Sequence, residues 1–168
     1  MPARYIDDLD FVNIAVQARE ALDLLLDGDF KYFSKLKALY TPDEWPAVLQ
    51  NILEQLGDSN RHGVYVDILI HENLKLRLLE YCKKHVHNIT DYYKHLVPEC
   101  KNDVGLIFVE YIRARAMHAN GRNHYRETCE IIRHYKKACG KEAAYAIRDE
   151  LKDKFPKRPA FLDELRKV

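Results

Sequence analysis

Residues 41–57 read TPDEWPAVLQNILEQLG, and this stretch decides the fold class. Its apolar residues recur at the i, i+3, i+4, i+7, i+8 and i+11 positions of one buried helix face, and they are Trp45, Val48, Leu49, Ile52, Leu53 and Leu56. Thr41 and Glu44 have the spacing of a capping box, and Pro42 suits a first helical turn. Gly57 follows the last apolar position, where helices often end. The stretch predicts an amphipathic α-helix.

The same periodicity continues on both sides of this helix. Before it, the spacing predicts a long first helix from about Phe11 to Leu25, which stops at Gly28, and a short second helix between Phe30 and Tyr40. After it, helical stripes follow over 74–86, 92–96, 104–118, 125–139, 144–155 and 162–165. No segment alternates convincingly over more than four residues, as a half-buried strand would. The sequence therefore predicts an all-α fold of about nine or ten helices.

Four tyrosines suggest an internal repeat. Tyr32, Tyr65, Tyr92 and Tyr125 lie 33, 27 and 33 residues apart, close to the period of about 34 residues of tetratricopeptide repeats. We therefore expect a single helical-repeat domain over residues 1–168, a degenerate TPR-like α-solenoid of stacked antiparallel helix hairpins. Such stacking leaves a curved face for a partner. The alternative is an irregular helical bundle with tyrosines where helices start, because no repeat carries the full consensus.

Composition excludes several classes of protein. The chain has 168 residues, 47% of them hydrophobic and 32% charged, with a net charge of +1, which is unlike a disordered chain. No apolar run approaches the ~20 residues of a membrane-spanning helix. The acidic start of the sequence is unlike a secretory signal, so we expect a cytoplasmic protein that does not bind membranes. Its four cysteines contain no Cys-x-x-Cys motif and are expected to be free thiols.

Charge is distributed unevenly along the chain. Residues 1–60 carry 5 basic and 11 acidic side chains, whereas residues 111–168 carry 15 basic and 8 acidic ones. The basic 113–141 segment contains the candidate nucleic-acid-binding residues, which are Arg113, Arg122, Arg126, Arg133, Lys136 and Lys137. Tyr125 and Tyr135 would be available to stack on bases. The other interpretation is a solvated helix face that also docks on acidic protein surface, and the net charge of +1 favours it.

The sequence offers little that points to catalysis. Cys82, His85 and His87, with His95 and Cys100 downstream, are the right ligand types for zinc, but their spacing matches no closed zinc site. Cys82 also lies on an apolar helix face, which predicts a structural role. Cys129 could pair with His118 or His124 as a nucleophile, but it too falls on a core face. No phosphate loop or nucleophile elbow occurs. We therefore expect no enzyme activity, metal, cofactor or small-molecule substrate.

Several short motifs carry a resemblance to a known family. In chain order they are Leu39–Tyr40, Glu44–Pro46, Leu78–Leu79, Asn123–Arg126, Lys136–Gly140 and Lys157–Leu165. From about residue 30 onward, and most densely over 123–165, the chain resembles the C-terminal helical region of bacterial SWIM-type zinc finger proteins. The family's zinc-binding element, Cys-x-Cys followed by Cys-x-His, is absent from this sequence. The resemblance implies the helical region of a larger protein, with a role in binding protein or nucleic acid and no catalytic residue.

Together these observations favour a non-enzymatic helical-repeat module for protein–protein interaction, part of a larger SWIM-like protein. The alternative function is nucleic-acid binding through the basic 113–141 segment. A third hypothesis is a metal site at Cys82, His85 and His87.

Overall fold

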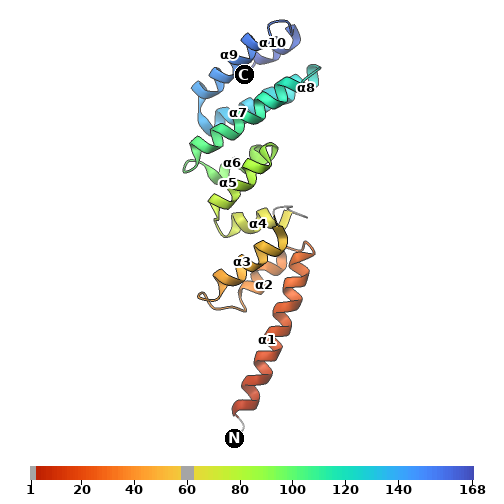
Figure 1. Cartoon of the computed structure of the whole chain (residues 1–168), viewed down its shortest axis with the longest axis vertical. Coiled ribbons are helices and arrows are strands. Elements are labelled where there is room, and N and C mark those ends of the chain that lie inside the picture. Colours follow the sequence, from red (N-terminus) through yellow and green to blue (C-terminus); the bar gives the residue numbers. More distant parts are fainter. Residues whose placement is uncertain (1–2, 58–62) are drawn as a thin grey trace. The chain divides into compact units, whose positions relative to one another are not determined.

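The computed structural model describes residues 3–57 and 63–168, with side chains from residue 10 onward (Figure 1). Contacts between Cα atoms divide the chain into two compact units, Met1–Leu74 and Lys75–Val168. The first contains α1 (Ala3–Leu26), α2 (Lys31–Lys37), α3 (Trp45–Leu56) and α4 (Val64–His71). The second contains α5 (Lys75–Lys84), a 3₁₀ turn (Val86–Asn88), α6 (Ile89–Leu96), α7 (Lys101–His118), α8 (Arg122–Cys139), α9 (Lys141–Lys154) and α10 (Pro159–Leu165).

This all-helical architecture confirms the predicted fold class. The described residues form ten α-helices and no strand, in agreement with the expected nine or ten helices. None of the helices in this part of the chain is both long enough and apolar enough to cross a bilayer. The prediction of one domain over residues 1–168 stays a prediction beside the division into two units.

Helix α3 shows how closely local sequence and structure correspond. The capping box forms: the Thr41 backbone N–H donates to Glu44 Oε2 at 2.9 Å, and the Glu44 N–H donates to Thr41 Oγ1 at 3.4 Å. Regular helix begins only at Trp45, so the box stabilises the turn that leads into α3. Gly57 ends the helix with a φ of 59°, a conformation that favours glycine.

The four tyrosines each lie within the first four residues of a helix, namely α2, α4, α6 and α8. Those helices have seven, eight, eight and eighteen residues. The tyrosines therefore mark helix starts, which both the solenoid and the bundle interpretation predict. The helices that they begin are unequal in length. The TPR-like arrangement of hairpins stays a prediction.

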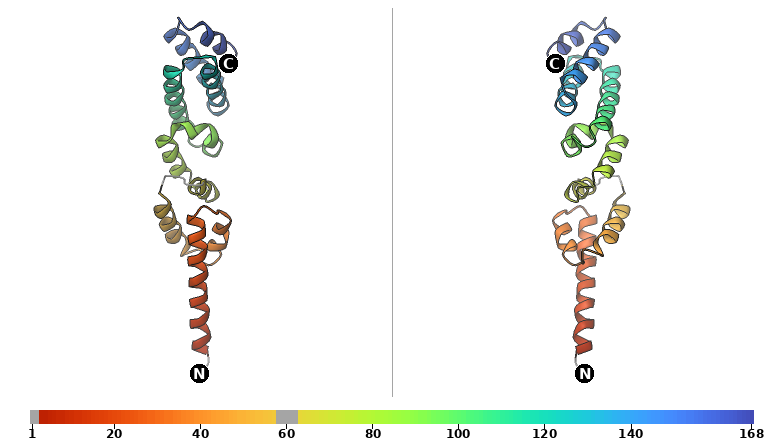
Figure 2. Two further views of the ribbon diagram at one scale, coloured as in Figure 1. Left: turned by 90° about the vertical axis from the view of Figure 1, so that its right-hand side faces the viewer. Right: turned by 90° about the vertical axis from the view of Figure 1, so that its left-hand side faces the viewer.

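Helix α1 packs on α2 and α3 through only part of its length. Ala18, Ala21 and Leu25 are buried there, and Leu25 is fully enclosed. Phe33 on α2 is the centre of this small core, with its ring 5.4 Å from that of Trp45 and 5.2 Å from that of His71. The N-terminal half of α1 extends beyond α2 and α3 (Figures 1 and 2). That half consequently has no neighbouring helix from its own unit.

Helix α8 is the central helix of the unit Lys75–Val168. It packs against α6, α7, α9 and α10. Cys129, Ile132 and Tyr135 of its predicted apolar stripe are buried, whereas Tyr125 and Cys139 at the two ends are half-buried. Gly140 follows the helix with a φ of 107°, which lets the chain turn directly into α9. The basic segment identified in the sequence therefore lies mainly on a helix that is packed by several neighbours.

Candidate functional site

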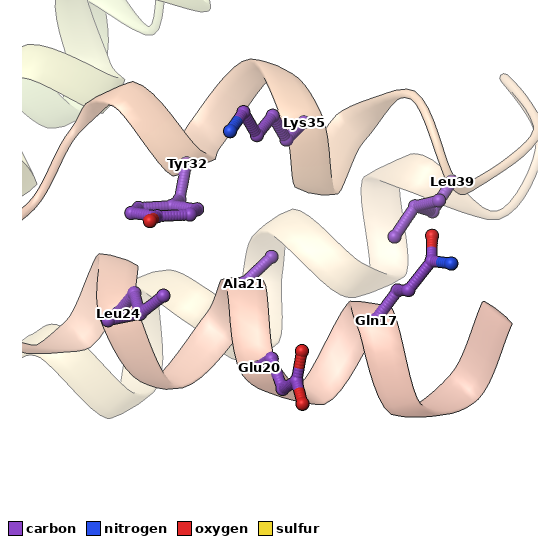
Figure 3. A pocket seen from close by; sticks show the side chains of 7 residues that line it. All are labelled: Gln17, Glu20, Ala21, Leu24, Tyr32, Lys35 and Leu39. Carbon is purple, nitrogen blue, oxygen red and sulfur yellow. The ribbon is translucent and has the colours of Figure 1, made fainter. Parts of the chain in front are cut away.

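A groove of about 470 Å³ lies between α1 and the segment that contains α2 (Figure 3). Gln17, Glu20, Ala21 and Leu24 form the α1 wall. The opposite wall consists of Tyr32 and Lys35 of α2 and, just beyond the helix, Leu39. Tyr32 and Leu24 stand at one end of the groove and Leu39 and Gln17 at the other (Figure 3).

Helical spacing explains why these side chains share one groove. On α1, Gln17, Ala21 and Leu24 are four and three residues apart, so they form one ridge along the helix. The facing segment repeats this spacing with Tyr32, Lys35 and Leu39. The Lys35 ammonium lies 4.9 Å from the centre of the Tyr32 ring, where the aromatic face attracts it. The result is a mostly apolar floor with charged groups along its edges.

Exposed apolar side chains concentrate on the same helix. Of the eight large hydrophobic side chains that are exposed in the described part of the chain, five lie on α1, namely Phe11, Val12, Ile14, Val16 and Leu24. Phe11 and Ile14 continue the stripe of Ala18 and Leu25 toward the N-terminus of α1. Val12 and Val16 lie on the other side of the helix. A helix that is apolar on nearly all sides is normally buried, so this segment has the composition of a contact surface.

Three carboxylates accompany this apolar surface. Asp10, Glu20 and Asp23 are exposed on α1, and none forms an ion pair with another residue within 10–57 or 63–168. The exposed surface of α1 is thus both apolar and acidic.

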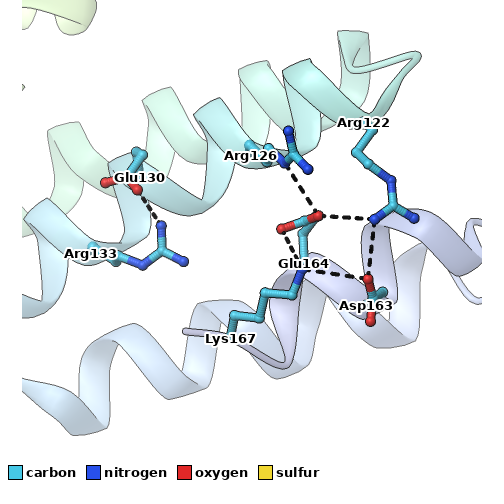
Figure 4. Close-up of polar contacts among 7 residues, drawn as sticks. All are labelled: Arg122, Arg126, Glu130, Arg133, Asp163, Glu164 and Lys167. Carbon is cyan, nitrogen blue, oxygen red and sulfur yellow. Dashed lines mark hydrogen bonds and ion pairs between the residues drawn. The ribbon is translucent and has the colours of Figure 1, made fainter.

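The predicted basic residues form a different arrangement around Glu164 of α10 (Figure 4). The Glu164 side chain is only 4% exposed, and its oxygens lie 3.4 Å from Arg122, 3.5 Å from Arg126 and 3.1 Å from Lys167. The hydrogen bond from Lys167 lowers the pKa of Glu164, and the two arginines lower it further. Arg122 also approaches Asp163 at 3.4 Å. These cations connect α8 to α10.

Two further arginines of the predicted set also have carboxylate partners. Arg113 on α7 makes two hydrogen bonds of 2.8 Å to Glu150 of α9, the paired geometry that guanidinium and carboxylate favour. Its hydrogen bond lowers the pKa of Glu150. Arg133 pairs with Glu130 one turn earlier on α8 (Figure 4). One interpretation of the sequence was that the basic segment docks on acidic protein surface. The carboxylates that Arg113 and Arg133 contact, Glu150 and Glu130, belong to the same unit as the arginines.

The two lysines of the set differ from each other. Lys136 donates to the Tyr145 hydroxyl at 3.2 Å and to the Val168 backbone carbonyl at 2.9 Å, which connects α8 to α9 and to the C-terminal residue. Its hydrogen bond lowers the pKa of Tyr145. Lys137 is exposed. Five of the six predicted cations therefore contact groups of their own unit, and their role in binding nucleic acid stays a prediction.

The tyrosines proposed to stack on bases are already in contact with other rings. Tyr125 stacks on Phe161 with 4.7 Å between ring centres. Tyr135 is 7% exposed and packs 5.5 Å from Phe108. Base stacking requires an accessible aromatic face. Buried Tyr135 does not present such a face, and Phe161 covers one face of the half-buried Tyr125.

The hypothetical metal site is divided between the core and the surface. Cys82 is fully buried, and burial raises the pKa of its thiol to about 12, although zinc binds the thiolate. The rings of His85 and His87 are 6.3 Å apart, near Tyr81. Among the described residues, no three His, Cys, Asp or Glu side chains gather in a way that could hold a metal ion. Cys129 is also buried, and its pKa is likewise raised to about 12 by burial.

Thiol labelling should separate the cysteines. At about pH 8, we expect iodoacetamide to modify the half-buried Cys100 and, more slowly because burial raises the pKa of its thiol, Cys139, and to leave Cys82 and Cys129 unmodified in the folded protein. Peptide mapping by mass spectrometry measures each site. In urea all four should react. Modification of Cys82 as fast as Cys100 in the folded protein would contradict its placement in the core.

Sequence reasoning missed the groove and the exposed helix. The signal was present in residues 11–16, FVNIAV, which place apolar side chains on almost every side of one helix rather than along one stripe. Comparison with protein-family models, with curated proteins and with solved structures finds no match. The resemblance to SWIM-type zinc finger proteins therefore stays a prediction that rests on the short motifs alone.

Proposed function

We propose that this chain is a non-enzymatic helical module that binds a protein partner through α1. The observation that carries the proposal is the concentration of exposed large apolar side chains on this one helix, next to a groove with an apolar floor. Monomeric proteins rarely expose such surfaces without a role in binding. The resemblance to the SWIM-type family, with its expected role in binding, agrees with this proposal and would place the module in a larger protein.

The alternative, nucleic-acid binding through the 113–141 segment, has weaker support. Phosphates would have to compete with the carboxylates that already pair with Arg113, Arg122, Arg126 and Arg133. Non-specific affinity grows with the number of phosphates that a protein neutralises, and here part of the positive charge is already balanced by carboxylates of the same unit. Exposed Lys137 alone supplies little affinity.

Site-specific photo-crosslinking tests the proposed function. A photoreactive phenylalanine analogue at Phe11 should crosslink one discrete protein in cells of the source organism, because this side chain is 74% exposed on the proposed surface. The matched control places the same analogue at Leu76, which is also 74% exposed but lies on α5. Mass spectrometry identifies the product. No discrete adduct at position 11, or the same adduct at position 76, would count against the proposal.

A further inference from the structure

The groove beside α1 has the dimensions of a site for one short helix. Its α1 wall extends toward the N-terminus through Ile14, which is three residues before Gln17 on the same ridge and is 45% exposed. From Ile14 to Leu24 the ridge spans ten residues, or about 15 Å at the usual rise per residue. Apolar ridges of this length, exposed on a helix pair, are the surfaces into which amphipathic helices lay their apolar face.

The charges along the groove indicate what the partner must carry. Asp10, Glu20 and Asp23 have no ion-pair partner in the described residues. Among the side chains that the structure describes, Lys35 is the one cation that lines the groove, and it stands on the α2 side with its ammonium over Tyr32. A ligand that buries its apolar face on this floor therefore meets the Glu20 carboxylate of the α1 wall, and a ligand that extends toward the N-terminus of α1 meets Asp10 on the same helix face as Gln17. Complementary charge at such an edge selects a partner and speeds its association.

From these observations we infer that the groove between α1 and α2 binds a basic amphipathic helix of another protein. The inference rests on the proposed function and names its site and the chemistry of the partner. The partner presents Leu-like side chains at i, i+3, i+4 and i+7 to the floor and Lys or Arg to Glu20 and Asp10. Leu24 and Ile14 are the apolar contacts that we expect to contribute most.

A second copy of the chain is the main competing occupant, and its own charges disfavour it. Of the α8 cations, Arg122, Arg126, Arg133 and Lys136 already contact Glu164, Glu130 and Tyr145 of their own unit, which leaves Lys137 exposed. Transferring them to a second copy would leave Glu164, with its 4% exposed side chain, without its partners. Unpaired buried carboxylates are costly.

The experiment uses three fluorescein-labelled peptides of about 14 residues, or four helical turns. The first is an amphipathic Leu/Lys helix, the second has the same leucine pattern with Glu in place of Lys, and the third is a Leu/Lys permutation without an apolar stripe. Fluorescence anisotropy measures their affinity for the full chain. We expect the first peptide to bind at least about tenfold more tightly than the other two.

Substitutions in the groove test the site itself. Leu24→Gln and Ile14→Gln should each weaken binding of the Leu/Lys helix by about tenfold, whereas Leu76→Gln, the same change at an exposed position on α5, should not. Glu20→Lys should weaken the Leu/Lys helix and strengthen the Leu/Glu helix. Asp43→Lys makes the same charge change outside the groove and should do neither. Circular dichroism verifies that each variant keeps its helical content.

Several results would overturn the inference. Equal affinity for the permuted or the Leu/Glu peptide would show that the apolar stripe or the basic charge is irrelevant. Binding that is insensitive to Leu24→Gln and Ile14→Gln would place the peptide elsewhere. A dimer in sedimentation that Leu24→Gln dissociates and Leu76→Gln does not would assign the groove to a second copy. A crosslink at Phe11 together with any of these results would still support the proposed function. It would contradict only the inference that the partner is a basic amphipathic helix.

Discussion

Replacing Phe33 with alanine should destabilise the unit Met1–Leu74 by about 3–5 kcal/mol, the usual cost of deleting a buried aromatic ring. Phe33 is fully buried and touches three rings, with centre distances of 5.4 Å to Phe30, 5.4 Å to Trp45 and 5.2 Å to His71. Leu25, Leu36 and Ile52 of the same unit are also fully buried, and the cavity left by the ring adds to the cost. Because α2 holds one wall of the groove, Phe33→Ala should also weaken binding there.

The chain provides its own probe for this measurement. Trp45 is its only tryptophan, it is 6% exposed, and it lies against Phe33, so its fluorescence reports unfolding of this unit. Urea titration followed at this residue should give a clearly lower midpoint for Phe33→Ala. The matched control is Phe11→Ala, which removes the same ring from a position that is 74% exposed and should change stability by less than about 0.5 kcal/mol. Similar midpoints for both variants would contradict the assigned core.

Much of the helical architecture was accessible from periodicity and glycine placement. The ends of α1 near Gly28, of α3 at Gly57 and of α8 at Gly140 agree with the sequence, because glycine there adopts a positive φ that other residues avoid. Local rules were less accurate at the start of α3, where Thr41 and Glu44 form their box but the helix begins at Trp45. Capping patterns identify the turn that leads into a helix and define its first residue less well.

The candidate site was harder to predict, because it depends on pairs of residues distant in sequence. Arg122 and Glu164 are 42 residues apart, and no local pattern shows that one neutralises the other. Counting charges along 113–141 identified the basic side chains but could not show that several of them pair with carboxylates of their own unit. Predicting the groove likewise requires both the side-chain spacing on α1 and the way α2 packs beside it, and only the spacing can be read from the sequence. Only the apolar character of residues 11–16 was visible beforehand.

Glu72 connects three helices of the first unit and makes its stability depend on pH. It follows α4, its side chain is 11% exposed, and its carboxylate accepts hydrogen bonds from Lys37 Nζ on α2 at 2.7 Å and from Trp45 Nε1 on α3 at 3.1 Å. His71 Nδ1 lies 3.1 Å from the same carboxylate. Burial alone would raise the pKa of Glu72, but these hydrogen bonds outweigh it and lower the pKa.

The direction of the pH effect follows from that lowered pKa. In the unfolded chain the carboxyl has its ordinary pKa of about 4.3, above the value in the folded state. The unfolded state therefore binds the proton more readily, so ionised Glu72 stabilises the fold at every pH above about 4.3. This contribution is lost as the pH falls from there through the folded pKa. Acid should weaken the connection among α2, α3 and α4.

Glu72→Gln should accordingly lower the free energy of unfolding by about 1–3 kcal/mol at about pH 7, because Lys37 loses its charged partner while the side chain keeps its shape. The difference between wild type and variant, followed through Trp45 fluorescence, should shrink steadily as the pH falls below about 4.3 and vanish once wild-type Glu72 is protonated. Glu54→Gln makes the same change at an exposed position of α3 and should alter stability by less than about 0.5 kcal/mol. A difference in unfolding free energy between wild type and Glu72→Gln that is constant with pH, or that grows in acid, would contradict the conclusion that the ionised Glu72 carboxylate stabilises the unit through its three partners.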